Sequence, residues 1–318
     1  MYRPGEESRT SAAAEVLFTC NECLRNCRAV RKDEASLGFC RSPRTLRIAR
    51  AAAHYGEEPC ISGTKGSGAV FFTGCNLRCV FCQNHSISCG QGGLEVSTQE
   101  FRDMLLRLED QGVHNINLVT GTHYTLEIAE ALSGLKLSIP VVWNSSGYES
   151  VSSLRQLEGL VQIYMPDYKY AEHRLAAAFS AAPDYPERAL AAVREMYRQT
   201  GPFVMGDDGL LKSGVLVRHL ILPGHIENTL KVMDILEDKL PVNKLLFSLM
   251  SQYTPLQDLM DSPAFRQYPE LRRTLTGAEY ERVMDYLDFS SIEEGFVQDL
   301  SSATEAMIPS FDGTGVRA

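Results

Sequence analysis

Three closely spaced cysteines, Cys75, Cys79 and Cys82, are the residues of this sequence best suited to chemistry. They follow a short apolar run and a glycine, in the spacing Cys-x3-Cys-x2-Cys, with a phenylalanine directly before the third cysteine. Three thiolates on one tight loop can bind three irons of a [4Fe–4S] cluster and leave the fourth iron open to an exogenous ligand. Zinc would normally require a fourth protein ligand, or a catalytic water on a different spacing. The spacing therefore favours an iron–sulfur cluster over three structural cysteines.

A second set of cysteines precedes the first, in the pattern Cys20-x2-Cys23-x3-Cys27-x12-Cys40. Four thiolates in so short a stretch fit either a zinc ion or an auxiliary [4Fe–4S] cluster, and both interpretations stay open. The stretch has few large apolar residues, so we expect a metal to order it. Its role is that of an electron relay, a substrate anchor or a structural staple; the alternative is four free thiols. Cys60 and Cys89 stand alone and are given no ligand role.

Residues 20–50 are rich in both cysteine and basic side chains, whereas the chain from residue 61 onward is acidic. All nine cysteines of the 318 residues precede residue 90, and residues 20–50 carry eight basic against three acidic side chains. From residue 61 onward, 21 basic side chains stand against 32 acidic ones, which disfavours a nucleic-acid-binding protein. No apolar run reaches about 18 residues and the first residues lack an apolar signal core, so we expect a cytoplasmic protein without a membrane span. Clustered cysteines in a reducing compartment indicate metal or catalysis rather than disulfides.

Short apolar runs alternate with helical patterns after the cysteine-rich stretch, which predicts a parallel sheet with right-handed crossovers. The predicted strands are Ala69–Thr73, Asn115–Thr120, Val141–Asn144, Gln162–Met165, Val215–Leu222 and Lys244–Leu249, and the predicted helices are Thr98–Asp110, Thr125–Leu132, Ser150–Leu157, Pro186–Thr200, Ile226–Asp238 and Gly277–Leu287. Six such units predict an α/β fold, a partial (β/α)6 TIM-type barrel, with a doubly wound sheet as the alternative. We expect an N-terminal Cys-rich module at 1–60, the barrel at 61–298 and a C-terminal tail at 299–318.

Polar and small residues follow every one of these predicted strands. They are Gly74–Cys75, Thr120–His123, Asn144–Gly147, Asp167–Lys169, Pro223–His225 and Ser251–Tyr253. Function collects at the carboxyl ends of parallel strands, so six polar ends in register predict the wall of one ligand site. His123 at one of these ends either faces the ligand or packs internally.

The cysteine loop resembles the cluster loop of the radical S-adenosylmethionine (SAM) superfamily. Together with the stretches Tyr164–Lys169 and Val217–Gly224, it is similar to pyruvate formate-lyase activating enzymes. The closer resemblance is to their PflX-like group, through Glu57–Gly63, His114–Thr120, Asn144–Tyr148 and Leu249–Pro255. The resemblance covers about residues 20–298.

The resemblance implies that Cys75, Cys79 and Cys82 ligate the cluster and that SAM binds its open iron. One electron then cleaves the sulfonium bond, giving methionine and a 5′-deoxyadenosyl radical that abstracts a hydrogen atom from the substrate. The cofactor carries the difficult chemistry, and the protein binds, orients and excludes side reactions. A flavodoxin or ferredoxin is implied as electron donor. Reducing surroundings favour iron–sulfur over zinc slightly for Cys20, Cys23, Cys27 and Cys40.

The resemblance also assigns SAM-binding positions. Thr120 and Thr122 replace a Gly-Gly-Glu stretch that contacts the SAM amino group, and their oxygens are the candidate substitutes. Asn144 and Ser145 match a pair at the ribose or at a bound cation, and Met165 and Asp167 match the remaining ligands of that cation. Lys169 matches a lysine beside SAM, and Arg218 an arginine aimed at it.

Three functions compete on this evidence. The first is an enzyme that makes a glycyl radical on another protein, as the activating-enzyme resemblance implies. Relatives with extra clusters often carry them after the radical motif, whereas the extra cysteines here precede it. The second is a radical SAM enzyme that acts on another peptide, a small molecule or a macromolecule. The third, a zinc-binding interaction protein on a degenerate barrel, is disfavoured because it has no need of an open iron site.

Overall fold

A curved sheet of parallel strands forms the centre of the protein in the computed structural model, which describes residues 19–33, 36–303 and 308–317. The parallel strands lie in the order β2 (Ser67–Phe72), β4 (Ile116–Val119), β5 (Val141–Ser145), β6 (Ile163–Pro166), β8 (Leu211–Leu220), β9 (Leu246–Met250) and β10 (Gly295–Val297). Three antiparallel strands extend it: β1 (Leu46–His54) on β2, β3 (Leu94–Val96) on β1, and β7 (Val204–Met205) on β8. The six predicted strands are all present.

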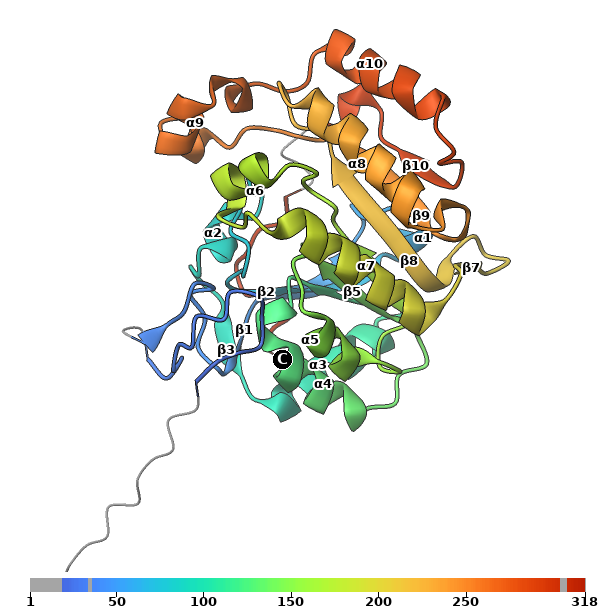
Figure 1. Cartoon of the computed structure of the whole chain (residues 1–318). Helices are drawn as coiled ribbons and strands as arrows, with labels where there is room; N and C mark the ends of the chain where they lie inside the picture. Colours follow the sequence, from blue (N-terminus) through green and yellow to red (C-terminus); the bar gives the residue numbers. More distant parts are fainter. Residues whose placement is uncertain (1–18, 34–35, 304–307, 318) are drawn as a thin grey trace, which may run out of the picture.

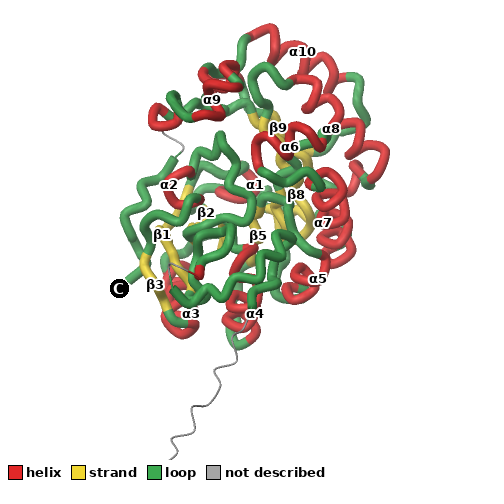
Figure 2. Tube along the Cα trace, turned by 60° about the vertical axis from the view of Figure 1, so that its left-hand side comes forward, coloured by secondary structure: helices red, strands yellow, loops and turns green. Residues whose placement is uncertain are grey.

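Helices cover the outside of the curved sheet, whereas loops occupy the opposite side (Figure 1, Figure 2). The larger ones are α3 (Thr98–Asp110), α4 (Thr125–Ser133), α6 (His173–Ser180), α7 (Tyr185–Thr200), α8 (Ile226–Lys239) and α10 (Gly277–Asp288). The shorter ones are α1 (Pro59–Ser62), α2 (His85–Ser88), α5 (Val151–Leu154) and α9 (Pro263–Gln267). Ser97 begins α3 as predicted: its hydroxyl accepts from the Glu100 amide, and the Glu100 carboxylate accepts from the Ser97 amide. The expectation of a partial α/β barrel is confirmed.

The two faces of the sheet are buried against different partners. The outward-facing side chains join the large core under the helices, where Trp143 and Phe101 are fully buried. At the amino end of the strands, a smaller cluster forms where Cys60 and Ile61 of α1 pack against Val142 and its neighbours on the inner face. The short helix α1 therefore fills the bottom of the barrel, and this carries the two glutamates that precede it toward the interior.

The strand β10 was not predicted. β10 pairs with β9 as a seventh parallel strand, and Gly295 is required there because an added Cβ would lie 1.8 Å from the Phe247 carbonyl oxygen. Farther along, the chain returns beside β1, where Gly313 N–H donates to Ala49 O at 2.9 Å. The described part of the tail therefore packs on the sheet.

The stretch before β1 has a different character from the barrel. Its described residues, 19–33 and 36–45, contain turns and bends but no strand and no α-helix. Since β1 itself pairs with β2, the predicted boundary near residue 60 is crossed by sheet hydrogen bonds, and the division into domains stays a prediction. Nowhere in the described chain is a helix both long and apolar enough to cross a membrane.

Candidate active site

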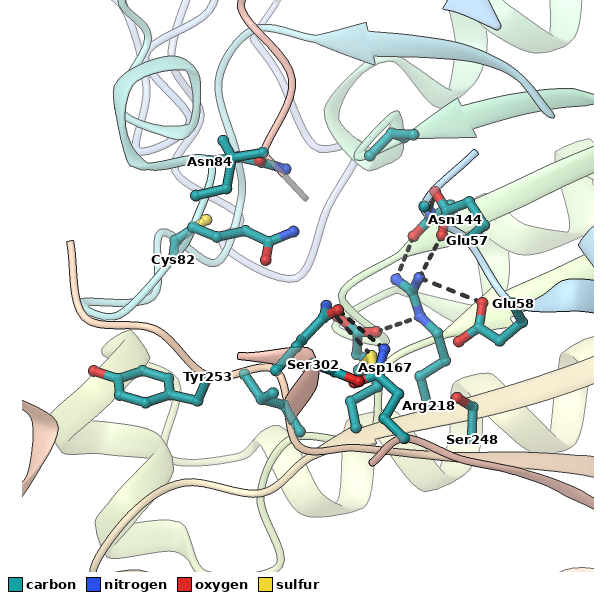
Figure 3. Close-up of a pocket in the computed structure, with 18 of the residues that line it drawn as sticks. Glu57, Glu58, Cys82, Asn84, Asn144, Asp167, Arg218, Ser248, Tyr253 and Ser302 are labelled. Atoms are coloured by element: carbon teal, nitrogen blue, oxygen red, sulfur yellow. Dashed lines mark hydrogen bonds and ion pairs between the residues drawn. The ribbon is translucent and has the colours of Figure 1, made fainter. Parts of the chain in front are cut away.

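One cavity of about 650 Å³ lies at the carboxyl ends of the parallel strands (Figure 3). The predicted site residues that line it are Cys75, Cys79, Cys82, Thr120, Asn144, Ser145, Asp167, Lys169 and Arg218. These residues come from β2, β4, β5, β6, β8 and the loops that follow these strands, so the sheet gathers positions that are up to about 140 residues apart in sequence. Of the residues predicted for this site, Thr122 and Met165 do not line the cavity.

The cysteine loop begins at a tight turn directly after β2. Gly74 has φ +88°, and an added Cβ would lie 1.8 Å from the Ser42 hydroxyl oxygen and 2.5 Å from the Cys40 carbonyl oxygen. A glycine is therefore required before Cys75 for both conformation and space. The loop is then tied to α6, because the Val80 N–H donates to the carbonyl of Phe179 at 2.9 Å.

Polar hydrogens point at two of the three sulfur atoms. The N–H groups of Leu77 and Arg78 lie 3.3 and 3.4 Å from Cys75 Sγ, and the Ser180 hydroxyl lies 3.1 Å from Cys79 Sγ. Such donors stabilise a thiolate, the form that binds iron. Without a metal ion, burial followed by the neighbouring thiols raises the pKa of Cys75 to about 11. Metal binding would therefore release protons from this loop.

These residues fit a [4Fe–4S] cluster with one open iron, because three thiols and no fourth cysteine line the described wall of the cavity. Among the residues that the structure describes, no group of three or more His, Cys, Asp or Glu side chains is arranged to hold a single metal ion. The thiolates of a [4Fe–4S] cluster bind separate irons, so they need not converge on one point as around a mononuclear ion.

The four N-terminal cysteines lie within electrostatic range of one another. Burial, with contributions from the charges of Cys40, Cys20 and Cys27, raises the pKa of Cys23 to about 12. Cys27 packs against Gly38, where an added Cβ would lie 2.6 Å from its sulfur. The buried guanidinium of Arg31 lies 3.6 Å from Cys20 Sγ, which places one positive charge beside this group of sulfurs.

A network of charges forms the floor of the cavity, away from the cysteines (Figure 3). The Arg218 guanidinium donates to Asp167 at 2.9 Å, to Glu57 at 2.9 Å and to the side-chain oxygen of Asn144 at 2.7 Å. Its planar group of donors satisfies all three acceptors at once. Arg218 thus lies between Asn144 and Asp167, the residues that were expected to bind a cation. The contact between Arg218 and SAM stays a prediction.

Glu58 extends this floor without joining its hydrogen bonds. Its Oε2 lies 4.0 Å from Arg218 Nη1 and has no hydrogen-bond partner, although its side chain is only 7% exposed. Burial is the main cause that raises the pKa of Glu58. The Arg218 guanidinium acts against it, and the negative charge of Glu57 adds to the increase. Asp167 behaves in the opposite way: burial acts against its charge, but Arg218 and Lys169 outweigh it and lower its pKa.

Lys169 brings a positive charge close to the cysteine loop. Its ammonium donates to Asp167, and it lines the same cavity as the three thiols. Burial opposes its charge, but Asp167 and the thiols of Cys79 and Cys82 together outweigh burial and raise its pKa to about 12. Lys169 is therefore charged at neutral pH, which suits an anionic ligand or the anionic sulfur site beside it.

The end of β5 is organised by a buried glutamate that sequence reasoning missed. Glu149 accepts hydrogen bonds from Thr122 at 3.1 Å, from the Trp143 indole at 2.7 Å and from Ser145 at 2.6 Å. Thr122 thus points away from the cavity, whereas Thr120, in the left-handed region at φ +63°, lines it. The hydroxyl of Ser145 is engaged by the same carboxylate.

Glu57 and Glu58 line the cavity but were not predicted as site residues, whereas His123 does not reach the cavity. Glu57 and Glu58 were noted only as part of a matching stretch, and their signal was a pair of acidic residues directly before a proline that starts a buried helix. His123 is internal: it is 1% exposed, donates to the Thr73 carbonyl at 2.9 Å, and burial with Arg31 lowers its pKa to about 3.

The sequence profile of the radical SAM superfamily matches residues 69–243, more than half of the chain. The chain therefore belongs to this superfamily, whose members use a [4Fe–4S] cluster and SAM. A protein of Methanocaldococcus jannaschii, "Uncharacterized protein MJ0674", is 27% identical over 287 residues, which cover 87% of this chain and 76% of that protein.

Two solved structures are similar to this chain. Streptococcus suis SuiB, crystallised with its precursor peptide SuiA, has a TM-score of 0.50 and 14% identity over 72% of this chain and 48% of that chain. The chain thus spans about half the length of SuiB. HydG, a maturase of the [FeFe]-hydrogenase, has a TM-score of 0.46 and 15% identity over 70% of this chain and 49% of that chain. At this identity the SuiB likeness supports the partial-barrel fold and no shared substrate.

Proposed function

We propose that this protein cleaves SAM reductively to form a 5′-deoxyadenosyl radical that abstracts hydrogen from a bound substrate. The observation that carries the proposal is the common cavity: the three cysteines at one end and the polar strand ends of the barrel enclose a single space. A bound cluster would supply the electron that breaks the sulfonium bond. The chain's own residues would bind, orient and shield the reactants.

Each part of the cavity has a task in this proposal. Cys75, Cys79 and Cys82 hold the cluster, with Lys169 balancing negative charge beside them. Thr120, Asn144 and Ser145 are the candidates for polar contacts with SAM, and the floor around Arg218 lies beyond them. The aromatic wall next to the loop, where the Phe81 ring centre is 5.8 Å from that of Phe179, excludes water from the reaction.

The substrate we propose is a glycyl radical enzyme, because the Cys75–Cys82 loop and the stretches Tyr164–Lys169 and Val217–Gly224 resemble pyruvate formate-lyase activating enzymes, and the PflX-like group in particular. A flavodoxin or ferredoxin in the cytoplasm would then supply the electron. We also propose that Cys20, Cys23, Cys27 and Cys40 hold a second metal centre, an iron–sulfur cluster or zinc.

The test is anaerobic reconstitution with iron and sulfide, followed by reduction in the presence of SAM. We expect methionine and 5′-deoxyadenosine in equal amounts, and absence of 5′-deoxyadenosine would reject SAM cleavage. A purified glycyl radical enzyme is then added, and electron paramagnetic resonance (EPR) should show a glycyl radical that depends on SAM. If 5′-deoxyadenosine forms but no glycyl radical appears, SAM cleavage stands and the proposed substrate is wrong.

A further inference from the structure

The N-terminal cysteine stretch packs directly against the loop of Cys75, Cys79 and Cys82. The Cys75 N–H donates to the Cys40 carbonyl at 3.3 Å, and the Ser42 hydroxyl donates to the Thr73 carbonyl at 2.8 Å. The contact at Gly74 is so close that no side chain fits between the two segments. The two cysteine sets therefore lie next to each other in space. In the sequence, the nearest members of the two sets, Cys40 and Cys75, are 35 residues apart.

Arg25, between Cys23 and Cys27, connects the two segments most extensively. Its Nε donates to Asn76 O at 2.6 Å and its Nη2 to Leu77 O at 3.4 Å, two carbonyls that lie between cysteines of the loop. The same guanidinium donates to the carbonyls of Ser180 and Ala181 at the end of α6. One side chain thus binds both the loop and the helix end that supports it, through charge-assisted hydrogen bonds.

Phe39, directly before Cys40, completes the connection. The Arg25 guanidinium lies 3.8 Å from the centre of its ring, and that of Arg78, from the loop itself, lies 5.2 Å from it. Arg78 also donates to the Phe39 carbonyl at 3.3 Å. Such stacking fixes the planes of both guanidinium groups.

The described N-terminal stretch is held by side-chain hydrogen bonds, such as those of Arg25 and Arg31, and not by regular secondary structure. Its described residues form no strand or α-helix, and Asn26, Arg28, Arg31 and Arg41 have φ values between 41° and 60°. Left-handed backbone at non-glycine residues is strained and persists only when its surroundings impose it. Three of these four residues directly flank Cys27 or Cys40, and bonds from the cysteine sulfurs to a metal centre would restrain the backbone at these positions.

We infer that Cys20, Cys23, Cys27 and Cys40 bind one metal centre, a [4Fe–4S] cluster, which through Arg25 and Phe39 holds the Cys75–Cys82 loop in its cluster-binding shape. The second half of this inference rests on the proposed function, since it takes the loop to bind a cluster. Arg25 is a positioning residue for that loop: it touches the carbonyls between the cysteines, not the substrate.

The metal centre is tested on the full-length chain with Cys75, Cys79 and Cys82 all changed to Ala. After anaerobic reconstitution with iron and sulfide, we expect about four irons to remain bound, whereas about one zinc in their place would contradict the proposed cluster. A further Cys23→Ala and Cys40→Ala pair should remove this metal. The inference is overturned if the triple variant binds no metal, or if its metal survives the second pair of changes.

The coupling is tested with Arg25→Ala and, as a matched control, Arg28→Asn. Arg28 is an exposed arginine of the same stretch in the left-handed region, which Asn tolerates. In Arg25→Ala, a chelator under anaerobic conditions should remove the iron of the Cys75–Cys82 loop about tenfold faster than in the wild type, since three or more hydrogen bonds are lost. The metal of the N-terminal stretch should stay bound, and the EPR spectrum of the loop cluster should change.

Arg25→Lys, which keeps the charge but not the planar fork, should recover only part of the retention. Equal iron release from wild type and Arg25→Ala, or equal effects of Arg25→Ala and Arg28→Asn, would overturn the coupling. Failure of the proposed function looks different: the wild-type loop then binds no iron or forms no 5′-deoxyadenosine, while the metal test on the triple variant is unaffected.

Discussion

The two ends of the cavity are built in different ways. The cysteine end is a single loop, from Cys75 to Cys82, whose ligands are fixed by spacing within eight residues. The floor is assembled from distant segments: Glu57 and Arg218, separated by 161 positions, meet at 2.9 Å because α1 enters the barrel beneath β8. A local motif defines the chemistry at one end, and only the completed sheet defines the other.

The difference has an energetic side. In the proposed function each thiol of the loop is an individual ligand, so loss of one would remove a bond to iron that no neighbour replaces. The floor is a network of compensating charges, in which Asp167, Glu57 and Glu58 face Arg218. Removal of the shared cation, Arg218, leaves buried carboxylates without a partner, and the cost appears in folding stability.

The largest expected effect is on activity at the cysteine end. In Cys79→Ala, SAM cleavage should fall by about a thousandfold or more, because iron cannot be retained with two thiolates. The measurement is 5′-deoxyadenosine formed per reconstituted protein. Cys89→Ala is the control: Cys89 lies outside the cavity beside His85, so this variant should keep wild-type cleavage. Cleavage that persists in Cys79→Ala would reject the assigned ligands.

At the floor, Arg218→Met should lower the free energy of unfolding by about 3–5 kcal/mol, since three buried carboxylates lose their shared cation. Urea unfolding measures this directly. Arg282→Met, which removes an exposed pair with Glu227, should cost about 1 kcal/mol or less. If the two variants lose the same free energy of unfolding, the ion pairs of the floor stabilise the fold no more than an exposed ion pair does.

A third effect concerns acid and the cysteine end. Burial lowers the pKa of His123 to about 3, beneath the loop, whereas an unfolded histidine titrates near 6.5. The unfolded state therefore binds the proton first, and stability is lost as the pH falls from 6.5 toward 3. Between pH 7 and pH 5 this histidine should account for about 2 kcal/mol of that loss.

The measurement is the urea midpoint of wild type and His123→Gln at pH 7, 6 and 5. The variant should start lower, because it changes a buried side chain, but should lose less stability on acidification. Parallel curves for the two proteins would show that burial does not lower the pKa of His123.

The contrast between local and assembled features explains how much the sequence could predict. The six parallel strands and the helices between them were predicted because each apolar run is buried on both faces and each helix has its own periodicity. The cysteine loop was predicted because its ligands share one short stretch. Strand β10 was missed since Gly295–Val297 is short, mostly exposed and stable only beside β9.

Side-chain direction at the strand ends could not be predicted from spacing. Thr122 and Thr120 are two positions apart, but Thr122 turns to Glu149 and only Thr120 faces the cavity, because a left-handed residue and a 3-10 turn (Thr122–Tyr124) end the simple alternation. Arg218 was placed in the cavity correctly. That Glu57 would bind it could not be known, because this depends on how α1 fills the bottom of the barrel.

The smallest expected effect distinguishes the two neighbouring glutamates of the floor. Burial raises the pKa of Glu58 above its unfolded value, so its charge lowers stability at neutral pH and this cost disappears as the pH falls through the folded pKa. Glu58→Gln keeps the shape and removes the charge; it should therefore be more stable than wild type at pH 8, by about 1 kcal/mol, with the difference shrinking toward pH 5. Glu57→Gln is the matched variant, and it should be destabilised at pH 8 because it breaks the 2.9 Å ion pair with Arg218. If Glu58→Gln loses as much stability as Glu57→Gln, the two carboxylates are equal partners of Arg218 and Glu58 is not the spare charge of the floor.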